Sequence, residues 1–144
     1  MESLICKSLL WKIGLSTEED YNAKLDVMFL KEPENDLLLE LESCSSDCVT
    51  TFGILQRYWK YDYKDLSVEE FGRCLLEGLK TTYFSNIFTI TEFGKKCYSL
   101  WQELPREINT KEPFHVLSYA DDPLSWGDEA QTREIYENLF DFYK

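Results

Sequence analysis

The chain has 144 residues, of which 44% are hydrophobic and 15% aromatic, and its formal net charge is −12. A chain of this length and composition buries a substantial apolar core, which excludes disorder as its main description. It contains no run of about 18 apolar residues, and charged side chains interrupt residues 1–15. We therefore expect neither a membrane-spanning helix nor a signal peptide.

Residues 2–13 predict a first helix, because apolar residues recur at four-residue spacing and Gly14, a typical helix-closing residue, follows them. Ser16 and Glu19 then match a capping box, in which a hydroxyl and a carboxylate satisfy backbone N–H groups at a helix start. The second helix should end before Pro33, since the residue preceding a proline is disfavoured in the helical region.

The next two segments are less regular. Asp36 can cap a brief helix over residues 37–41, although this compact apolar run also fits a short strand. Residues 46–60 carry apolar side chains at helical spacing, and Gly53 weakens that helix without excluding it.

Two capping boxes with hydrophobic staples give the clearest helix starts, Ser67 with Glu70 and Thr89 with Glu92. The second of these helices should end before Pro105. The apolar residues that bracket the two boxes are Leu66, Phe71, Phe88 and Phe93.

The remaining chain predicts a loop through residues 105–127, followed by a last helix that begins at Asp128 and carries two apolar stripes as far as Tyr143. These elements predict an all-α bundle of about six helices in a single domain, 1–144. An α+β fold with a small sheet is the alternative, if residues 36–42 or 114–119 pair as strands.

The negative charge is concentrated in two regions. Residues 16–47 hold ten acidic residues against two lysines, and residues 121–144 hold seven against one arginine and one lysine, whereas residues 48–120 are balanced. Such regions either solubilise helix faces or attract a basic partner. No basic stripe is present, so we expect no direct nucleic-acid binding.

Catalytic and metal-binding patterns are weak. His115 is the single histidine, with no second histidine or cysteine nearby to build a zinc site. Cys44 and Cys48 would share a face if this segment is helical, but they lack further ligands, so buried small apolar thiols are the better interpretation. The odd number of cysteines without a close CxxC pair indicates free thiols and a cytoplasmic location. No phosphate-binding or dinucleotide motif occurs, so we expect no enzyme activity and no cofactor.

Residues 119–129 alternate aromatic and acidic side chains ahead of the last helix, a composition typical of protein interfaces. The candidate contact residues are Tyr119, Asp121, Asp122, Trp126, Asp128 and Glu129. The alternative interpretation is structural, with Trp126 filling the core and Asp128 capping the helix.

This acidic helical chain resembles bacterial immunity proteins of polymorphic or contact-dependent growth-inhibition toxin systems. The resemblance is based on residues 52–59 and 117–129, together with the size and composition of the chain. The resemblance implies a non-enzymatic inhibitor whose partner is a cognate toxin domain, often a basic nuclease. Two other hypotheses stay open. The first is an acidic nucleic-acid mimic or adaptor that binds a DNA- or RNA-binding protein, and the second is an enzyme that uses His115 or the thiols.

Overall fold

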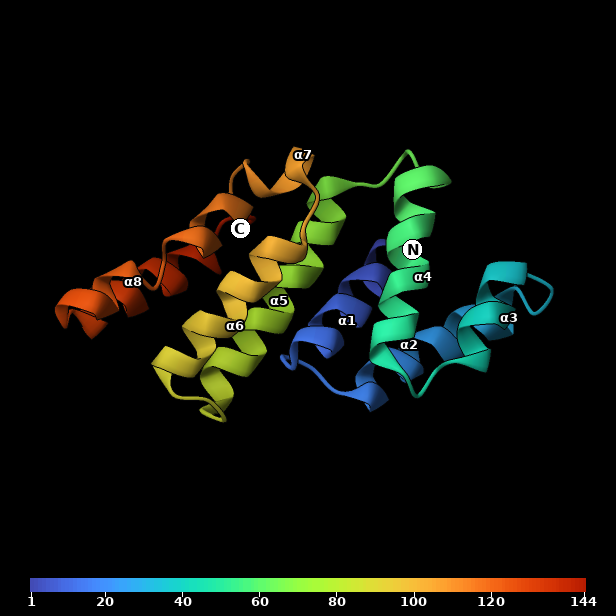
Figure 1. The fold of residues 1–144 in the computed structure, drawn as a ribbon, viewed down its shortest axis with the longest axis horizontal. Helices are drawn as coiled ribbons and strands as arrows, with labels where there is room; N and C mark the ends of the chain where they lie inside the picture. Colours follow the sequence, from blue (N-terminus) through green and yellow to red (C-terminus); the bar gives the residue numbers. More distant parts are fainter. The chain divides into compact units, whose positions relative to one another are not determined.

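The computed structural model describes residues 1–144 and contains helices and no strand (Figure 1). The all-α prediction is confirmed, and both strand alternatives are wrong. There are eight α-helices where about six were expected. The α-helices are α1 (Glu2–Ile13), α2 (Glu18–Lys31), α3 (Asp36–Ser43), α4 (Cys48–Tyr61), α5 (Val68–Ser85), α6 (Ile90–Glu103), α7 (Arg106–Asn109) and α8 (Glu129–Leu139). Two 3₁₀ helices, η1 (Phe114–Ser118) and η2 (Asp122–Trp126), lie between α7 and α8.

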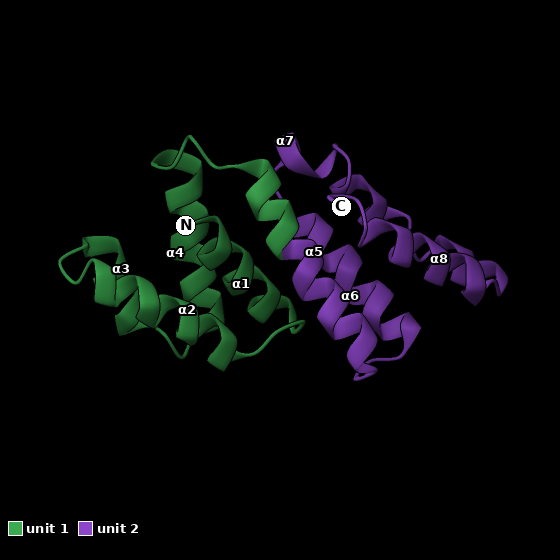
Figure 2. Ribbon diagram, turned by 180° about the vertical axis from the view of Figure 1, so that it is seen from behind, with its two compact units in different colours: residues 1–74 green, residues 75–144 purple.

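The helices gather into two compact units, Met1–Cys74 and Leu75–Lys144, with the boundary inside α5 (Figure 2). The expectation of one domain over 1–144 stays a prediction.

In the first unit, α1 packs against α2 and α4, and α2 packs against α3. The faces that meet are apolar: Leu4, Ile5, Leu9, Tyr21, Leu25, Leu38, Leu41, Phe52 and Leu55 are all buried. Trp11 stacks on Tyr21 with ring centroids 5.2 Å apart. Burial of this apolar surface is the main source of the unit's stability.

In the second unit, α6 packs against η1, and α8 packs against η2. Tyr83 of α5 and Phe140 lie in T-shaped contact, with centroids 5.3 Å apart, and Phe93 and Tyr136 make a similar contact at 5.0 Å. The Tyr83 hydroxyl donates a hydrogen bond of 2.8 Å to Glu137. These contacts fix α8 against the helices that precede it.

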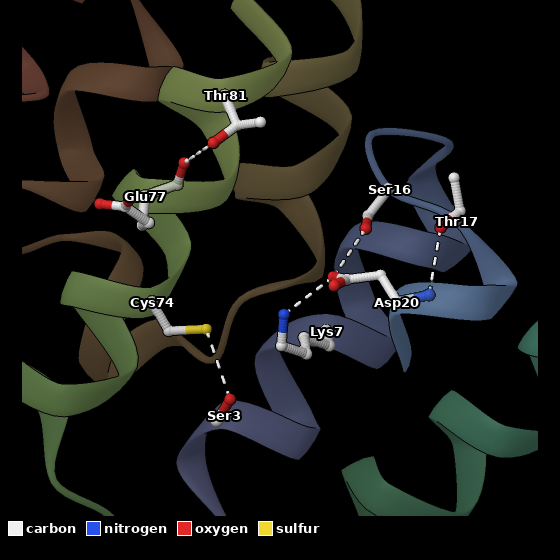
Figure 3. A network of polar contacts seen from close by, with 8 residues as sticks. All are labelled: Ser3, Lys7, Ser16, Thr17, Asp20, Cys74, Glu77 and Thr81. Carbon is white, nitrogen blue, oxygen red and sulfur yellow. Dashed lines mark hydrogen bonds and ion pairs between the residues drawn. The ribbon is translucent and has the colours of Figure 1, made fainter. Parts of the chain in front are cut away.

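The predicted starts of α2 and α3 are each displaced by one residue. Thr17 caps α2 by accepting a hydrogen bond from the Asp20 N–H, while the Ser16 hydroxyl donates to the Asp20 carboxylate at 3.1 Å (Figure 3). Asn35, not Asp36, caps α3. The Ser16 N–H donates to the Leu10 carbonyl, so Ser16 still belongs to the end of α1.

Other boundaries follow the expected chemistry. Gly14 closes α1 in the left-handed conformation, at φ 89°. The Ser67 and Thr89 hydroxyls accept the N–H groups of Glu70 and Glu92. The Ser67 N–H, however, donates to the carboxylate of Glu2 instead of to its capping-box partner.

Two expectations about the second half of the chain are wrong. The predicted loop over 105–127 contains α7, η1 and η2. The last helix ends at Leu139, where 3₁₀-type hydrogen bonds from Asp141 and Phe142 replace the α-helical pattern. Phe142 lies beyond this end and is 48% exposed.

Candidate protein-binding surface

The backbone of the candidate segment 119–129 is anchored to the second unit. Ala120, which precedes Asp121, and Pro123, which follows Asp122, are both buried in the core. Gly127 then reverses the chain with φ 78°, a conformation that glycine adopts without strain. The Asp128 N–H donates to the Pro123 carbonyl at 2.9 Å. The segment is therefore a tightly turned part of the fold and not an open loop.

Trp126 and Asp122 are the residues of this segment that point most clearly to solvent. Trp126 is 62% exposed, although tryptophan is among the residues that folded proteins bury most on average. Its interpretation as a core residue is therefore wrong. Asp122, in the first turn of η2, is also exposed.

Tyr119 is 39% exposed and touches the ring of His115, with centroids 5.6 Å apart in an edge-to-face arrangement. This places the single histidine directly beside the candidate segment. His115 itself is exposed. An aromatic pair and an indole are thus available on the same stretch of chain that carries the carboxylates.

Asp121 lies differently from its neighbour, because it packs against α6. A Cβ atom built on Gly94 would lie 2.8 Å from the Asp121 Cβ, so the absence of a side chain at Gly94 permits this approach. Burial raises the pKa of Asp121, and the adjacent charge of Asp122 raises it further. Asp121 is close enough to Cys97 and Tyr136 to raise the pKa of both, in addition to the larger effect of their burial.

Asp128 and Glu129 have structural contacts as well. Asp128 caps α8 by accepting the Gln131 N–H at 3.0 Å, which confirms the capping interpretation. Glu129 forms an exposed ion pair with Arg133 at 3.2 Å, one helical turn away. Of the six candidates, Asp128 is thus used as a helix cap. Glu129 is held only by a surface ion pair, which contributes little because water screens it.

The sequence also missed a thiol pair. Within the first unit, Cys6 and Cys74 lie close enough for each thiol to shift the pKa of the other, although nothing in their spacing pairs them. The pair that spacing did single out is not on one helix: Cys44 follows the end of α3, whereas Cys48 begins α4. Both are half-buried, so the interpretation as buried apolar thiols is wrong for them.

No group of three His, Cys, Asp or Glu side chains is arranged to hold a metal ion. No helix combines the length and the apolar character that a bilayer crossing requires. Comparison of the chain with protein-family models, curated proteins and solved structures found no match.

Proposed function

We propose that the chain is a non-enzymatic immunity protein that binds and neutralises a cognate toxin domain, a basic nuclease, through the aromatic and acidic residues of segment 119–129. The observation that carries the proposal is the exposed indole of Trp126 on an anchored backbone, at the other end of the short 3₁₀ helix that begins with Asp122. Large aromatic side chains of this kind are enriched among the residues that dominate binding energies.

The chemistry of the segment is complementary to a basic partner. Arg side chains of a nuclease would bond to the carboxylates of Asp122 and Glu129 and stack on the Trp126 ring. The acidic excess of residues 121–144 would attract such a partner before contact. Since the turns of η1 and η2 already hold the segment, little conformational entropy would be lost on binding.

The role of the six candidates is not uniform in this proposal. Asp122, Trp126 and Tyr119 make direct contacts, because their side chains are exposed. Asp121 and Asp128 support the surface from behind, the first against α6 and the second at the start of α8. Glu129 is available to a partner when its surface ion pair with Arg133 opens.

A calorimetric titration tests the proposal, with the toxin domain encoded by the adjacent gene as the second component. One-to-one binding with a nanomolar Kd is expected. Trp126→Ala should weaken binding by at least about 30-fold, which corresponds to the ~2 kcal/mol that defines a hot spot. Phe142→Ala is the matched control, because Phe142 is also an exposed aromatic residue of the second unit.

The same experiment separates the alternative function. A nucleic-acid mimic or adaptor would bind several unrelated DNA-binding proteins and compete with DNA for each of them. An immunity protein would bind its own toxin domain and leave those proteins free. No heat of binding with the toxin domain, from folded components, would overturn the proposal.

A further inference from the structure

The proposed function leaves one group of reactive side chains without a role. This group lies between α1 and the first turns of α5, inside the first unit. Ser3, Cys6 and Lys7 lie on one face of α1, because they are spaced by three and four residues. The Cys74 Sγ lies 3.8 Å from the Ser3 Oγ (Figure 3). Cys6 follows Ser3 by about one turn on that face, and each thiol shifts the pKa of the other.

The two thiols differ in their access to solvent. Cys6 has no exposed surface, whereas Cys74 is only half-buried. A small solute can therefore reach Cys74 first, and Cys6 is then the one neighbouring sulfur in position to react with the product. This arrangement of an accessible thiol beside a sheltered one is that of a redox-reactive cysteine with a resolving partner.

The two thiols also differ in pKa, and the accessible one, Cys74, has the lower pKa. The hydrogen bond from Cys6 lowers the pKa of Cys74 to about 7 against the opposing effect of burial, and Ser3 and Lys7 also lower it. Asp20, which pairs with Lys7 at 2.8 Å, acts in the opposite direction. Burial raises the pKa of Cys6 well above its ordinary value. At neutral pH the thiolate therefore forms on Cys74, and Cys6 keeps its proton.

We propose that Cys74 is a peroxide-reactive thiol and that Cys6 resolves its oxidised form as an intramolecular disulfide. The Cys74 thiolate attacks hydrogen peroxide, so that an S–O bond forms, the O–O bond breaks and hydroxide leaves, taking a proton to become water. The Cys6 sulfur then loses its proton and attacks the Cys74 sulfenic acid, so that the S–S bond forms and a second water leaves. Two thiols lose two electrons in total, and the peroxide gains them.

The other cysteines provide internal comparisons. Cys97 is fully buried and burial raises the pKa of its thiol, so it should resist oxidation. Cys44 and Cys48 are half-buried like Cys74, and the Cys44 thiol contacts backbone carbonyls and the Thr51 hydroxyl. We expect both to be oxidised after Cys74, whose pKa is lowered to about 7.

The test exposes the full chain to limiting hydrogen peroxide, blocks remaining thiols with N-ethylmaleimide and maps the peptides by mass spectrometry. We expect a Cys6–Cys74 linked peptide that dithiothreitol removes, formed before any oxidation of Cys44 or Cys48. Cys6→Ser, which keeps a hydrogen-bond donor beside Cys74, should accumulate a sulfenic acid on Cys74 that dimedone captures, and Cys74→Ser should leave Cys6 reduced.

Wild-type measurements keep the proposal falsifiable even where a substitution at buried Cys6 disturbs folding. Faster peroxide oxidation of Cys44 or Cys48 than of Cys74 in the folded wild-type chain would overturn it. So would oxidation of Cys74 to a stable sulfenic or sulfinic acid without linkage to Cys6. Neither result depends on the toxin-binding function proposed above.

Discussion

Single side chains in this protein perform tasks that their sequence neighbours do not reveal. Glu2 lies at the start of α1, yet its carboxylate accepts hydrogen bonds from the Tyr63 hydroxyl at 2.7 Å and from the Ser67 N–H at 2.9 Å. Glu2 thereby takes over half of the capping box that Glu70 was expected to complete. A contact between the start of α1 and the start of α5 has no local sequence signal, because the two are far apart along the chain.

Replacement of Glu2 should therefore destabilise the fold. Glu2→Ala leaves the Ser67 N–H and the Tyr63 hydroxyl without their acceptor, and we expect the free energy of unfolding to fall by about 1–3 kcal/mol. Glu2→Gln keeps an acceptor oxygen and should lose less. Urea denaturation at pH 7 measures both, and equal stability of wild type and Glu2→Ala would contradict this role.

The stabilisation by Glu2 should also depend on pH. Burial tends to raise the pKa of Glu2, but the hydrogen bonds from Ser67 and Tyr63 outweigh it and hold the pKa below the ordinary value of 4.5. Because the folded-state pKa is lowered, this stabilisation is present above pH 4.5 and disappears as the pH falls through the folded-state value. The stability difference between wild type and Glu2→Gln should shrink over that range in denaturation curves recorded at successive pH values.

The reactivity of Cys74 provides another prediction for a single residue. With a pKa of about 7, its alkylation rate should rise through neutral pH and level off above it. Cys97, whose pKa burial raises, should remain unmodified in the folded chain. Timed iodoacetamide labelling followed by peptide mapping measures the two rates, and equal protection of both thiols at pH 8 would refute the difference.

At the scale of helices, the sequence predicted which helices form better than it predicted where they begin and end. Local chemistry located the Gly14 stop and the hydroxyl caps of Ser67 and Thr89, because these signals depend on a few adjacent residues. The 3₁₀ turns between α7 and α8 were missed, since their apolar residues are too few to establish a period. Their burial against α6 and α8 depends on tertiary packing.

The sequence also predicted the location of the candidate segment but not how its side chains are oriented. Its alternating aromatic and acidic composition identified residues 119–129, but the orientation of each carboxylate could not be read from it. Asp121 faces α6 only because position 94 lacks a side chain. That close approach joins two segments whose relation the sequence does not encode locally.

Two glycine substitutions test this packing. Gly94→Ala would place a Cβ atom 2.8 Å from the Asp121 Cβ, and we expect a loss of about 1–3 kcal/mol in unfolding free energy from overpacking. Gly53→Ala is the matched control, because nothing lies within 4 Å of its added Cβ in α4, and it should gain about 0.5–1 kcal/mol. Thermal denaturation measures both.

A compensating change checks the cause. Removing the Asp121 side chain by Asp121→Gly in the Gly94→Ala background should restore part of the lost stability, since the two Cβ atoms then no longer meet. If Gly94→Ala is as stable as wild type, Gly94 and Asp121 do not approach each other as closely as proposed.

For the whole molecule, the relevant property is the distribution of charge. Residues 121–144, which include most of segment 119–129, hold seven acidic side chains against Arg133 and Lys144. Charge of one sign accelerates the approach of an oppositely charged partner and is screened by salt. Specific affinity then depends on buried contacts such as that of an aromatic anchor.

Charge reversal at one exposed site separates these contributions. Asp122→Lys should weaken toxin binding at low salt by about tenfold or more and by less at high salt, because screening already reduces the attraction there. Glu134→Lys in α8 makes the same change in net charge at another exposed position of the unit. An equal effect of both substitutions would mean that net charge, and not segment 119–129, controls binding.

Protection of cells from the toxin domain tests the central claim most directly. Cells that produce the toxin domain encoded next to this chain should grow when the wild-type chain or Phe142→Ala is co-expressed, and should stop growing with Trp126→Ala at equal protein levels. Growth arrest in the presence of the folded wild-type chain, or full protection by Trp126→Ala, would contradict the proposed function of the segment.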